Sequence, residues 1–471
     1  MSDVHIYSPA IFYSFSFAQN HHWTSTHPSG QEITGYLANV CAKYGIVDKI
    51  QLHTDVRDLR WLEDEEEWEV TLAYLVPGTG DLSQKQRQEK IAAEGDTSVY
   101  VATEIVRAKI AISAVGGIVE PNVFPNNIPG METFEGDLIH TARWREDVDL
   151  KGKDVIVIGT GCSAVQVVPH LVKSPFEVKS ITQLMRTPPW VIPPEMDPSA
   201  EERWNKVTQS VPGLLSLARL LIFYKTERDY HSMFSKNPDT DRRRVVEERY
   251  LRYMREHAPT KYHDLLTPNY QIGCKRRVTD GGWFETLHHS NVQLTSQPLL
   301  SVQAHSVTLG SKSLYPPEAT QDSDLVSTEN TVPADAIILA NGYHAAEWLH
   351  PLRVIGRDGK SIHDIWEERG GPQAYLGIAM DKFPNFFMIF GPNTATGHSS
   401  VILASENAVN YILRFVKSIL DGTVSTWEVK EEAERKWTSR IQKDLKETTF
   451  QRGGCVSWYS NDKGWNSLIY P

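Results

Sequence analysis

At 471 residues, with 40% apolar and 23% charged residues, the chain is long enough for two or three domains with substantial cores. Its net charge of -11 argues against nucleic acid or an anionic membrane as a general partner. The longest apolar stretch, residues 214–223, contains Arg219 and is too short to span a bilayer. We expect a core helix there, with a surface patch as the alternative, and no membrane contact.

In chain order, the first predicted element is a helix over residues 31–43, whose apolar positions share one face. Residues 50–112 then alternate between polar and apolar side chains, which is typical of a β-meander. A charged insert, residues 81–97, interrupts the meander, and we expect a solvated loop. The Gly-, Pro- and Asn-rich stretch 114–130 marks a domain boundary.

Residues 153–190 predict a β-α-β unit with the glycine turn GTGCSA between its first strand and its helix. Gly159 permits a tight turn, and Gly161 lets the backbone approach a pyrophosphate. The N–H groups of the following helix would point at the phosphates. A plain strand-helix turn is the alternative reading. The expected dinucleotide contacts in this unit are Gly159, Thr160, Gly161, Ser163, Ala164 and Gln166.

The end of the next strand indicates which dinucleotide binds. An NAD site would offer Asp or Glu to the ribose 2′-hydroxyl there, but this chain has Arg186 followed by Thr187. A guanidinium suits a 2′-phosphate, which favours NADPH over NADH. The alternative is an arginine that only caps the strand. The second glycine cluster, VPGTGDLSQ at residues 76–84, follows a strand but leads into polar and charged residues, so we interpret it as a hairpin turn.

Further along, a polar helical region is predicted over residues 200–258, and strands return between about 290 and 345. The last third contains a helix near residues 404–419 and ends in an aromatic-rich tail. Residues 200–260 and the tail after residue 440 are expected to shape a substrate pocket.

The four cysteines, Cys41, Cys162, Cys274 and Cys455, lie far apart and form no Cys-x-x-Cys pair. This pattern fits a reducing compartment and speaks against a disulfide framework or a zinc ribbon. The segment HDIWEE lacks the second histidine of a zinc motif. Since no signal segment opens the chain, we expect a cytoplasmic protein without a metal site.

The stretch FEGDLIHTARWRE, residues 134–146, is the most specific one. By chemistry alone, His140 and Trp144 would more often be a packing pair than catalytic groups. The pattern of Phe134, Gly136, His140 and Trp144, however, resembles the fingerprint of the Baeyer–Villiger flavin monooxygenases. That fingerprint usually closes with Pro or Asp where this chain has Arg145, which leaves Baeyer–Villiger chemistry and heteroatom oxygenation both open. Further blocks of the family follow in order from about residue 12 onward, closest to fungal members of secondary metabolism.

The resemblance implies an enzyme that uses FAD, NADPH and O₂ to insert one oxygen atom into a small organic substrate, a ketone in fungal secondary metabolism. Arg276 matches the family's catalytic arginine, which would stabilise an oxygen anion. Without the family resemblance, Arg276 would be interpreted as part of a solvated run of charged residues. Lys275, with Arg186 and Thr187, matches contacts of the NADPH 2′-phosphate. Asp3 matches a catalytic aspartate near the flavin, and the remaining flavin contacts implied are Tyr13 and Val56.

The fold implied is α/β with two dinucleotide-binding, Rossmann-like domains. We expect residues 1–130 to be the first part of the FAD-binding domain, 131–345 the NADPH-binding domain with a helical insert, and 346–471 the second part of the FAD-binding domain with the tail. In the family a first Gly-x-Gly-x-x-Gly unit opens the chain, so we expect the first domain to be N-terminally truncated and to bind FAD poorly. The alternatives are an N- or S-oxygenating monooxygenase and a flavin-free protein that binds NADPH or cyclises a substrate.

Overall fold

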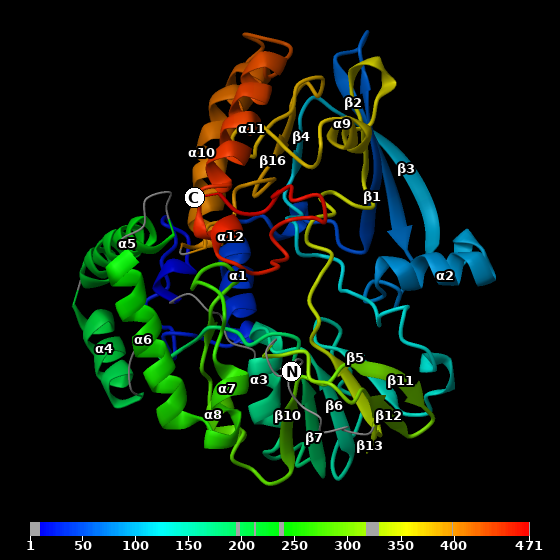
Figure 1. Ribbon diagram of the computed structural model, residues 1–471. Coiled ribbons are helices and arrows are strands. Elements are labelled where there is room, and N and C mark those ends of the chain that lie inside the picture. Colours follow the sequence, from blue (N-terminus) through cyan, green and yellow to red (C-terminus); the bar gives the residue numbers. More distant parts are fainter. Residues whose placement is uncertain are drawn as a thin grey trace.

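The computed structural model describes residues 10–194, 198–211, 213–234, 240–316, 329–397 and 399–470. A parallel five-stranded sheet, in the order β10-β7-β6-β14-β5, forms the lower part of the molecule in Figure 1. Its strands are β5 (Asp137–His140), β6 (Asp154–Ile158), β7 (Ser180–Leu184), β10 (Val292–Thr295) and β14 (Ala336–Leu339). Because both faces of this sheet are covered, all four residues of β14 and the first four residues of β6 are buried.

The two faces of the parallel sheet pack against different elements. Val155 and Val157 of β6 face a core that includes α3 (Cys162–Leu171) and α8 (Trp283–Thr286). Ile156, between them, faces a second core together with a small antiparallel sheet. The strands of that small sheet are β11 (Leu299–Gln303), β12 (Ser306–Leu309) and β13 (Asn330–Pro333).

The upper part of the molecule holds a mixed four-stranded sheet and a separate parallel strand pair (Figure 1). The mixed sheet has the order β15-β1-β2-β3, with β1 (Thr54–Leu62), β2 (Glu67–Leu75), β3 (Tyr100–Ala108) and β15 (Arg353–Ile355). The parallel pair is β4 (Ala111–Ser113) with β16 (Phe386–Met388), and α10 (Val401–Leu420) packs against Phe387. The meander predicted over residues 50–112 is therefore confirmed as β1, β2 and β3, whereas β4 leaves it for another sheet.

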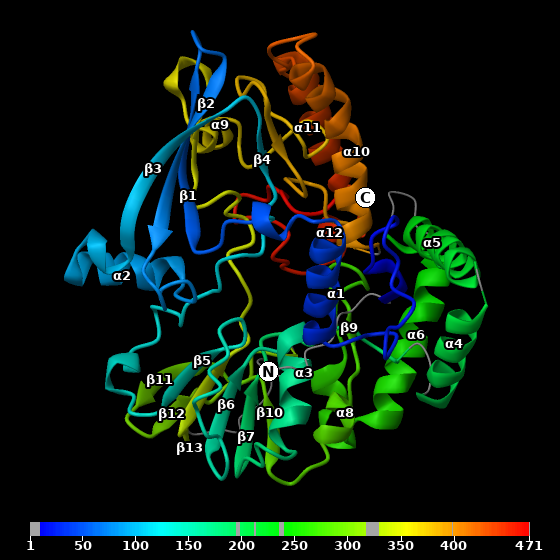
Figure 2. The ribbon, with the colours of Figure 1, turned by 180° about the vertical axis from the view of Figure 1, so that it is seen from behind.

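The remaining helices fill the space around the sheets. They are α1 (Gly30–Lys43), α2 (Gln84–Glu94), α4 (Pro198–Ser210), α5 (Leu214–Met233), α6 (Thr240–His257), α7 (His263–Leu266), α9 (Ile362–Glu368), α11 (Glu431–Leu445) and α12 (Thr449–Arg452). Figure 2 shows α4, α5 and α6 gathered as a helical lobe beside the parallel sheet. The short pair β8 (Val191–Ile192) and β9 (Val278–Thr279) lies next to this lobe.

The structure corrects the prediction for residues 81–97 and refines the prediction for residues 214–223. The charged insert is not a loop but contains α2, because Ser83 and Gln86 form a capping box that starts the helix. Helix α5 is partly a core helix, since Leu215 and Ala218 are buried, but Leu217 and Leu221 are exposed. Within the described residues, no helix combines the length and the apolar character needed to cross a membrane.

Candidate functional site

The glycine turn lies between the buried strand β6 and helix α3. Gly159 has a φ of 120°, and a Cβ at this position would come within 2.5 Å of the Ala340 carbonyl oxygen. Gly161 is the N-cap residue of α3, no side chain caps the helix there, and a Cβ on Gly161 would meet no atom within 4 Å. Ala164 is fully buried against the sheet. The turn therefore leaves the N-terminal N–H groups of α3 without a side-chain cap, as an anion site requires.

A cluster of basic side chains lies at the end of the neighbouring strand β7. The Lys275 ammonium donates a hydrogen bond to Thr187 Oγ1 at 2.5 Å. Thr160 Oγ1, in the glycine turn, approaches the Thr187 carbonyl oxygen at 3.4 Å. Burial, together with the positive charge of Arg186, lowers the pKa of Lys275 to about 8. The structure thus brings the predicted residues Thr160, Arg186, Thr187 and Lys275 to one place.

Arg276 lies on a loop between the basic cluster and the C-terminal tail. Arg276 is exposed and directly follows the half-buried Lys275. The loop continues into β9, where the Val278 N–H donates to the Trp190 carbonyl oxygen at 2.9 Å. Tyr459 of the tail lies close to Arg276: burial raises the pKa of Tyr459 to about 12, and the Arg276 charge opposes that shift. Sequence reasoning missed Tyr459, because nothing local connects residues 276 and 459.

The prediction that the cysteines form no disulfide is wrong. Cys274 and Cys455 are joined by a disulfide, with their Cα atoms 6.1 Å apart and their positions separated by 181 in the sequence. Their spacing gave no signal because the two segments meet only in the folded chain. Cys41 and Cys162 take no part in a disulfide.

The fingerprint residues form a latch beside the parallel sheet rather than part of the glycine turn. His140, the last residue of β5, accepts a hydrogen bond at Nδ1 from the Ala142 N–H, so its Nε2 carries the proton toward Asn341 Oδ1, 3.1 Å away. Asn341 in turn donates to the Val123 carbonyl oxygen. Burial lowers the pKa of His140. His140 therefore joins β5 to both segments that connect the lower and upper parts of the molecule.

The other three fingerprint residues, Phe134, Gly136 and Trp144, make structural contacts of their own. A Cβ on Gly136 would lie 2.4 Å from the Asp335 carbonyl oxygen, so only glycine fits there. The Phe134 side chain packs against the hydrophobic core that includes Ile337, and Trp144 makes an edge contact with Phe176. Arg145, the departure from the family pattern, pairs at the surface with Asp137 and Asp147.

The sequence of this chain is similar to those of several known proteins. Residues 82–198 match the family described as FMO-like, flavin-binding monooxygenase-like. The FAD-binding monooxygenase ktnD of Aspergillus niger is 31% identical over 465 residues, which cover 98% of this chain and 69% of that protein. A Baeyer-Villiger monooxygenase of Streptomyces coelicolor is 31% identical over 469 residues, which cover 98% of this chain and 79% of the relative.

The chain belongs to the flavin-binding monooxygenase family. This confirms both the predicted resemblance and the predicted enzyme class, a flavin monooxygenase. The structure of cyclohexanone monooxygenase from Rhodococcus sp. Phi1 bound to NADP⁺ matches 99% of this chain and 85% of its own, with a TM-score of 0.73 and 23% identity. An OTEMO complex with FAD and NADP gives a TM-score of 0.74 at 20% identity, over 100% and 86% of the two chains. These likenesses confirm the α/β fold with two dinucleotide-binding domains.

The predicted flavin-site residues of this monooxygenase lie on other elements than the glycine turn. Tyr13 is half-buried next to the short 3-10 helix Ala10–Phe12, and Ser400 at the start of α10 donates to the Phe12 carbonyl oxygen. Val56 lies on β1 with 44% of its surface exposed. Asp3 lies outside the described residues. Tyr13 and Val56 thus stay predictions as flavin contacts.

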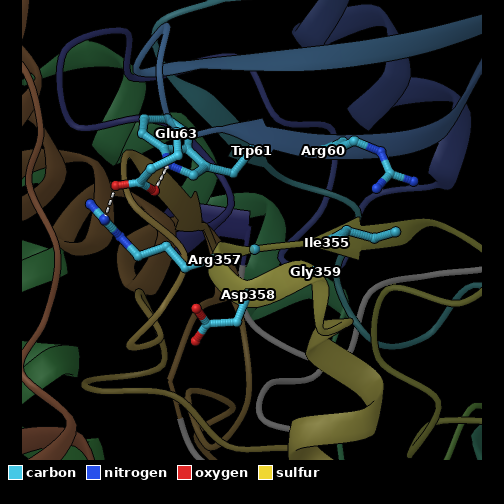
Figure 3. Close-up of a pocket in the computed structure, with 8 residues that line it drawn as sticks. Arg60, Trp61, Glu63, Ile355, Arg357, Asp358 and Gly359 are labelled. Carbon is cyan, nitrogen blue, oxygen red and sulfur yellow. Dashed lines mark hydrogen bonds and ion pairs between the residues drawn. The ribbon is translucent and has the colours of Figure 1, made fainter.

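A separate pocket of about 590 Å³ lies in the upper part of the monooxygenase, between β1 and residues 355–359 (Figure 3). Glu63 pairs there with Arg357 and accepts a hydrogen bond from Trp61 Nε1. Figure 3 shows Arg60 pointing away from this pair. Because Glu63 and Arg357 already satisfy each other, we assign this pocket no part in the chemistry. Among the described residues, no three His, Cys, Asp or Glu side chains are grouped as a metal ion would need.

Proposed function

We propose that this chain binds NADPH at the β6–α3 turn and inserts one oxygen atom of O₂ into a small ketone. The observation that carries the coenzyme assignment is the contact between Lys275 Nζ and Thr187 Oγ1 beside Arg186. Two cationic side chains and a hydroxyl at the end of the second strand fit a 2′-phosphate. The N-terminus of α3 would bind the pyrophosphate. The residues present fit NADPH.

FAD is the second proposed cofactor, and it is named for the relative ktnD and for the OTEMO complex. The chemistry that a bound flavin supplies is the activation of O₂. In the described residues, the upper parallel sheet consists of β4 and β16, and no helix there starts after a Gly-x-Gly turn. Those residues do not provide a cradle for the FAD pyrophosphate, and no residue of this chain is assigned to it.

Arg276 is the proposed catalytic residue. Its guanidinium is fixed in charge at any working pH and lies on the loop that begins at Lys275, next to the coenzyme site. A cation in this place would stabilise the negative charge that develops on the substrate oxygen as the new carbon–oxygen bond forms. The fungal secondary-metabolite role, and a cytoplasmic location, belong to the same proposal.

The test of this function compares coenzymes and substrates on the purified chain. We expect tighter binding of NADP⁺ than of NAD⁺ by calorimetry, flavin absorbance after incubation with FAD, and conversion of a cyclic ketone to a lactone with NADPH consumed. Oxidation of a tertiary amine or a sulfide but not of the ketone would contradict the Baeyer–Villiger assignment. A colourless protein that binds NADP⁺ and ignores FAD would support the flavin-free alternative.

A further inference from the structure

The disulfide Cys274–Cys455 connects the candidate active-site loop to the C-terminal tail. Cys274 is fully buried and directly precedes Lys275, whereas Cys455 is half-buried in the tail. The chain segments around these two cysteines are in close contact. The Gln271 N–H donates to the Gly453 carbonyl oxygen at 2.8 Å, and a Cβ on Gly453 would lie 2.5 Å from the Cβ of Cys274.

We propose that this disulfide is a redox-controlled tether that positions Lys275 and Arg276, and that its reduction by a dithiol weakens coenzyme binding. The inference rests on the proposed function, because it takes Lys275 as a ligand of the NADPH 2′-phosphate. Cys274 and Cys455 act in it as positioning residues, since neither is placed against the substrate or the coenzyme.

The positioning argument follows from how the loop is held at its two ends. On the far side, residues 278 and 279 pair with β8, which fixes the loop after Arg277. On the near side, the disulfide holds the residue immediately before Lys275. Lys275 reaches Thr187 from between these anchors. Opening the bond would release the near anchor while the pairing of β9 with β8 remained.

The tail also supplies a group that interacts electrostatically with Arg276, the proposed catalytic residue. Tyr459 is buried four positions after Cys455, and its hydroxyl lies close enough to Arg276 for the two to interact electrostatically. A tail held by the disulfide keeps this phenol within electrostatic range of the Arg276 charge. The same bond would therefore hold in place both Lys275, the proposed phosphate ligand, and Arg276, the proposed catalytic residue.

A reductant can reach the bond from the side of Cys455. Val456 is 81% exposed and Trp458 is 44% exposed, so this part of the tail lies at the surface. One thiolate of the dithiol attacks Sγ of Cys455 and breaks the S–S bond, and the Cys274 sulfur leaves as a thiolate that takes up a proton. The second thiolate of the reductant then displaces the Cys455 sulfur. Two electrons pass to the protein, and the dithiol becomes a disulfide.

The experiment follows the tether and the coenzyme separately in the full chain. Alkylation followed by mass spectrometry should label Cys41 and Cys162 before treatment with dithiothreitol, and all four cysteines after it. Reduction should weaken NADP⁺ binding at least about fivefold, the low end of the coupling between linked sites. It should also speed cleavage by chymotrypsin at the tail residues 456–459.

Two variants make the result specific. Cys455→Ser should bind NADP⁺ as the reduced protein does and should not respond to dithiothreitol. Cys41→Ser, which alters a free thiol on α1, should keep the full response. The pH profile adds a readout that general destabilisation would not move. With Lys275 released toward solvent, the loss of NADP⁺ affinity at alkaline pH should shift to higher pH.

Labelling of all four cysteines without reductant would overturn the proposal, as would equal affinity and equal tail cleavage in both redox states. If NADP⁺ bound in neither state, the proposed function would fail instead. The proposal that the disulfide is a tether would then be tested by the cleavage measurement alone. Faster cleavage after reduction would support it, and equal cleavage would overturn it.

Discussion

At the scale of single residues, Lys275 has the most unusual environment in the candidate site. Its ammonium is half-buried, faces Thr187 and is repelled by Arg186, so its pKa falls to about 8. A lysine in such a place binds an anion strongly, because the anion removes the repulsion that the free protein carries. The same environment makes the charge of Lys275 sensitive to pH near neutrality.

This environment predicts a pH dependence of coenzyme affinity. As pH rises through about 8, free Lys275 loses its proton, so the NADP⁺ affinity should fall while the NAD⁺ affinity stays constant. Lys275→Arg should remove the pH dependence, because arginine stays charged. Lys275→Ala should lose about 1.5–3 kcal/mol of NADP⁺ binding at pH 7, the contribution of a hydrogen bond to a charged group. Calorimetry between pH 7 and 9 measures all three, and a flat profile for the unmodified protein would contradict the role of Lys275.

At the scale of elements, strand β5 and the β6–α3 glycine turn each contain a glycine at which a neighbouring backbone carbonyl lies too close for a side chain. Gly136 enters β5 directly beside Asp335, which precedes β14, and leaves no room for a methyl group. Pairing of the edge strand β5 with β14 places His140 at the end of the sheet. The conformation of this glycine therefore determines the position of the fingerprint histidine.

Gly136→Ala should destabilise the protein by about 1–3 kcal/mol, because a Cβ there would overlap backbone atoms. Gly35→Ala is the matched control, since Gly35 lies exposed in α1 and a Cβ there would meet nothing within 4 Å. The control should be neutral or stabilising by up to about 1 kcal/mol. Urea unfolding compares the two variants, and equal effects would mean that the close approach to Asp335 is not what requires glycine.

Sequence reasoning worked best where the signal is local along the chain. The glycine turn, helix α3 and the basic end of β7 were all predicted within one β-α-β unit. The capping box of α2 was equally local, as Ser83 three residues before Gln86, but the charged composition around it hid the helix. Cys455 and Tyr459 could not be predicted as neighbours of residues 274–276, because only the folded tail brings them there.

At the scale of the whole molecule, the lower and upper parts are joined by two connecting segments, visible between the sheets in Figure 1. His140 holds both through Asn341 and Val123, and its ring is neutral because burial lowers its pKa. Protonation would set a second N–H against the Ala142 N–H, which already donates to Nδ1. The latch is therefore stable only with the neutral ring.

This latch predicts a loss of stability in acid. Because the pKa of His140 is lower in the folded than in the unfolded chain, its contribution is complete above pH 6.5 and is lost as pH falls from there through the folded pKa. His140→Ala should lower stability at pH 7.5 by about 1–3 kcal/mol and should weaken the pH dependence between 7 and 5. His305→Gln, at a 68% exposed side chain, is the control and should change neither. Thermal unfolding at several pH values tests this, and identical pH slopes for His140→Ala and the unmodified protein would refute it.

Two neighbouring residues of one loop, Lys275 and Arg276, are proposed to serve two different steps. The most direct measurement combines NADP⁺ affinity with ketone turnover in the presence of added FAD, for Lys275→Ala and Arg276→Ala. Lys275→Ala should weaken NADP⁺ binding and reduce its preference over NAD⁺. Arg276→Ala should keep NADP⁺ affinity while turnover falls by about 10²–10³, as for loss of one group that stabilises an oxyanion. Unchanged turnover in Arg276→Ala, or unchanged coenzyme preference in Lys275→Ala, would contradict the account.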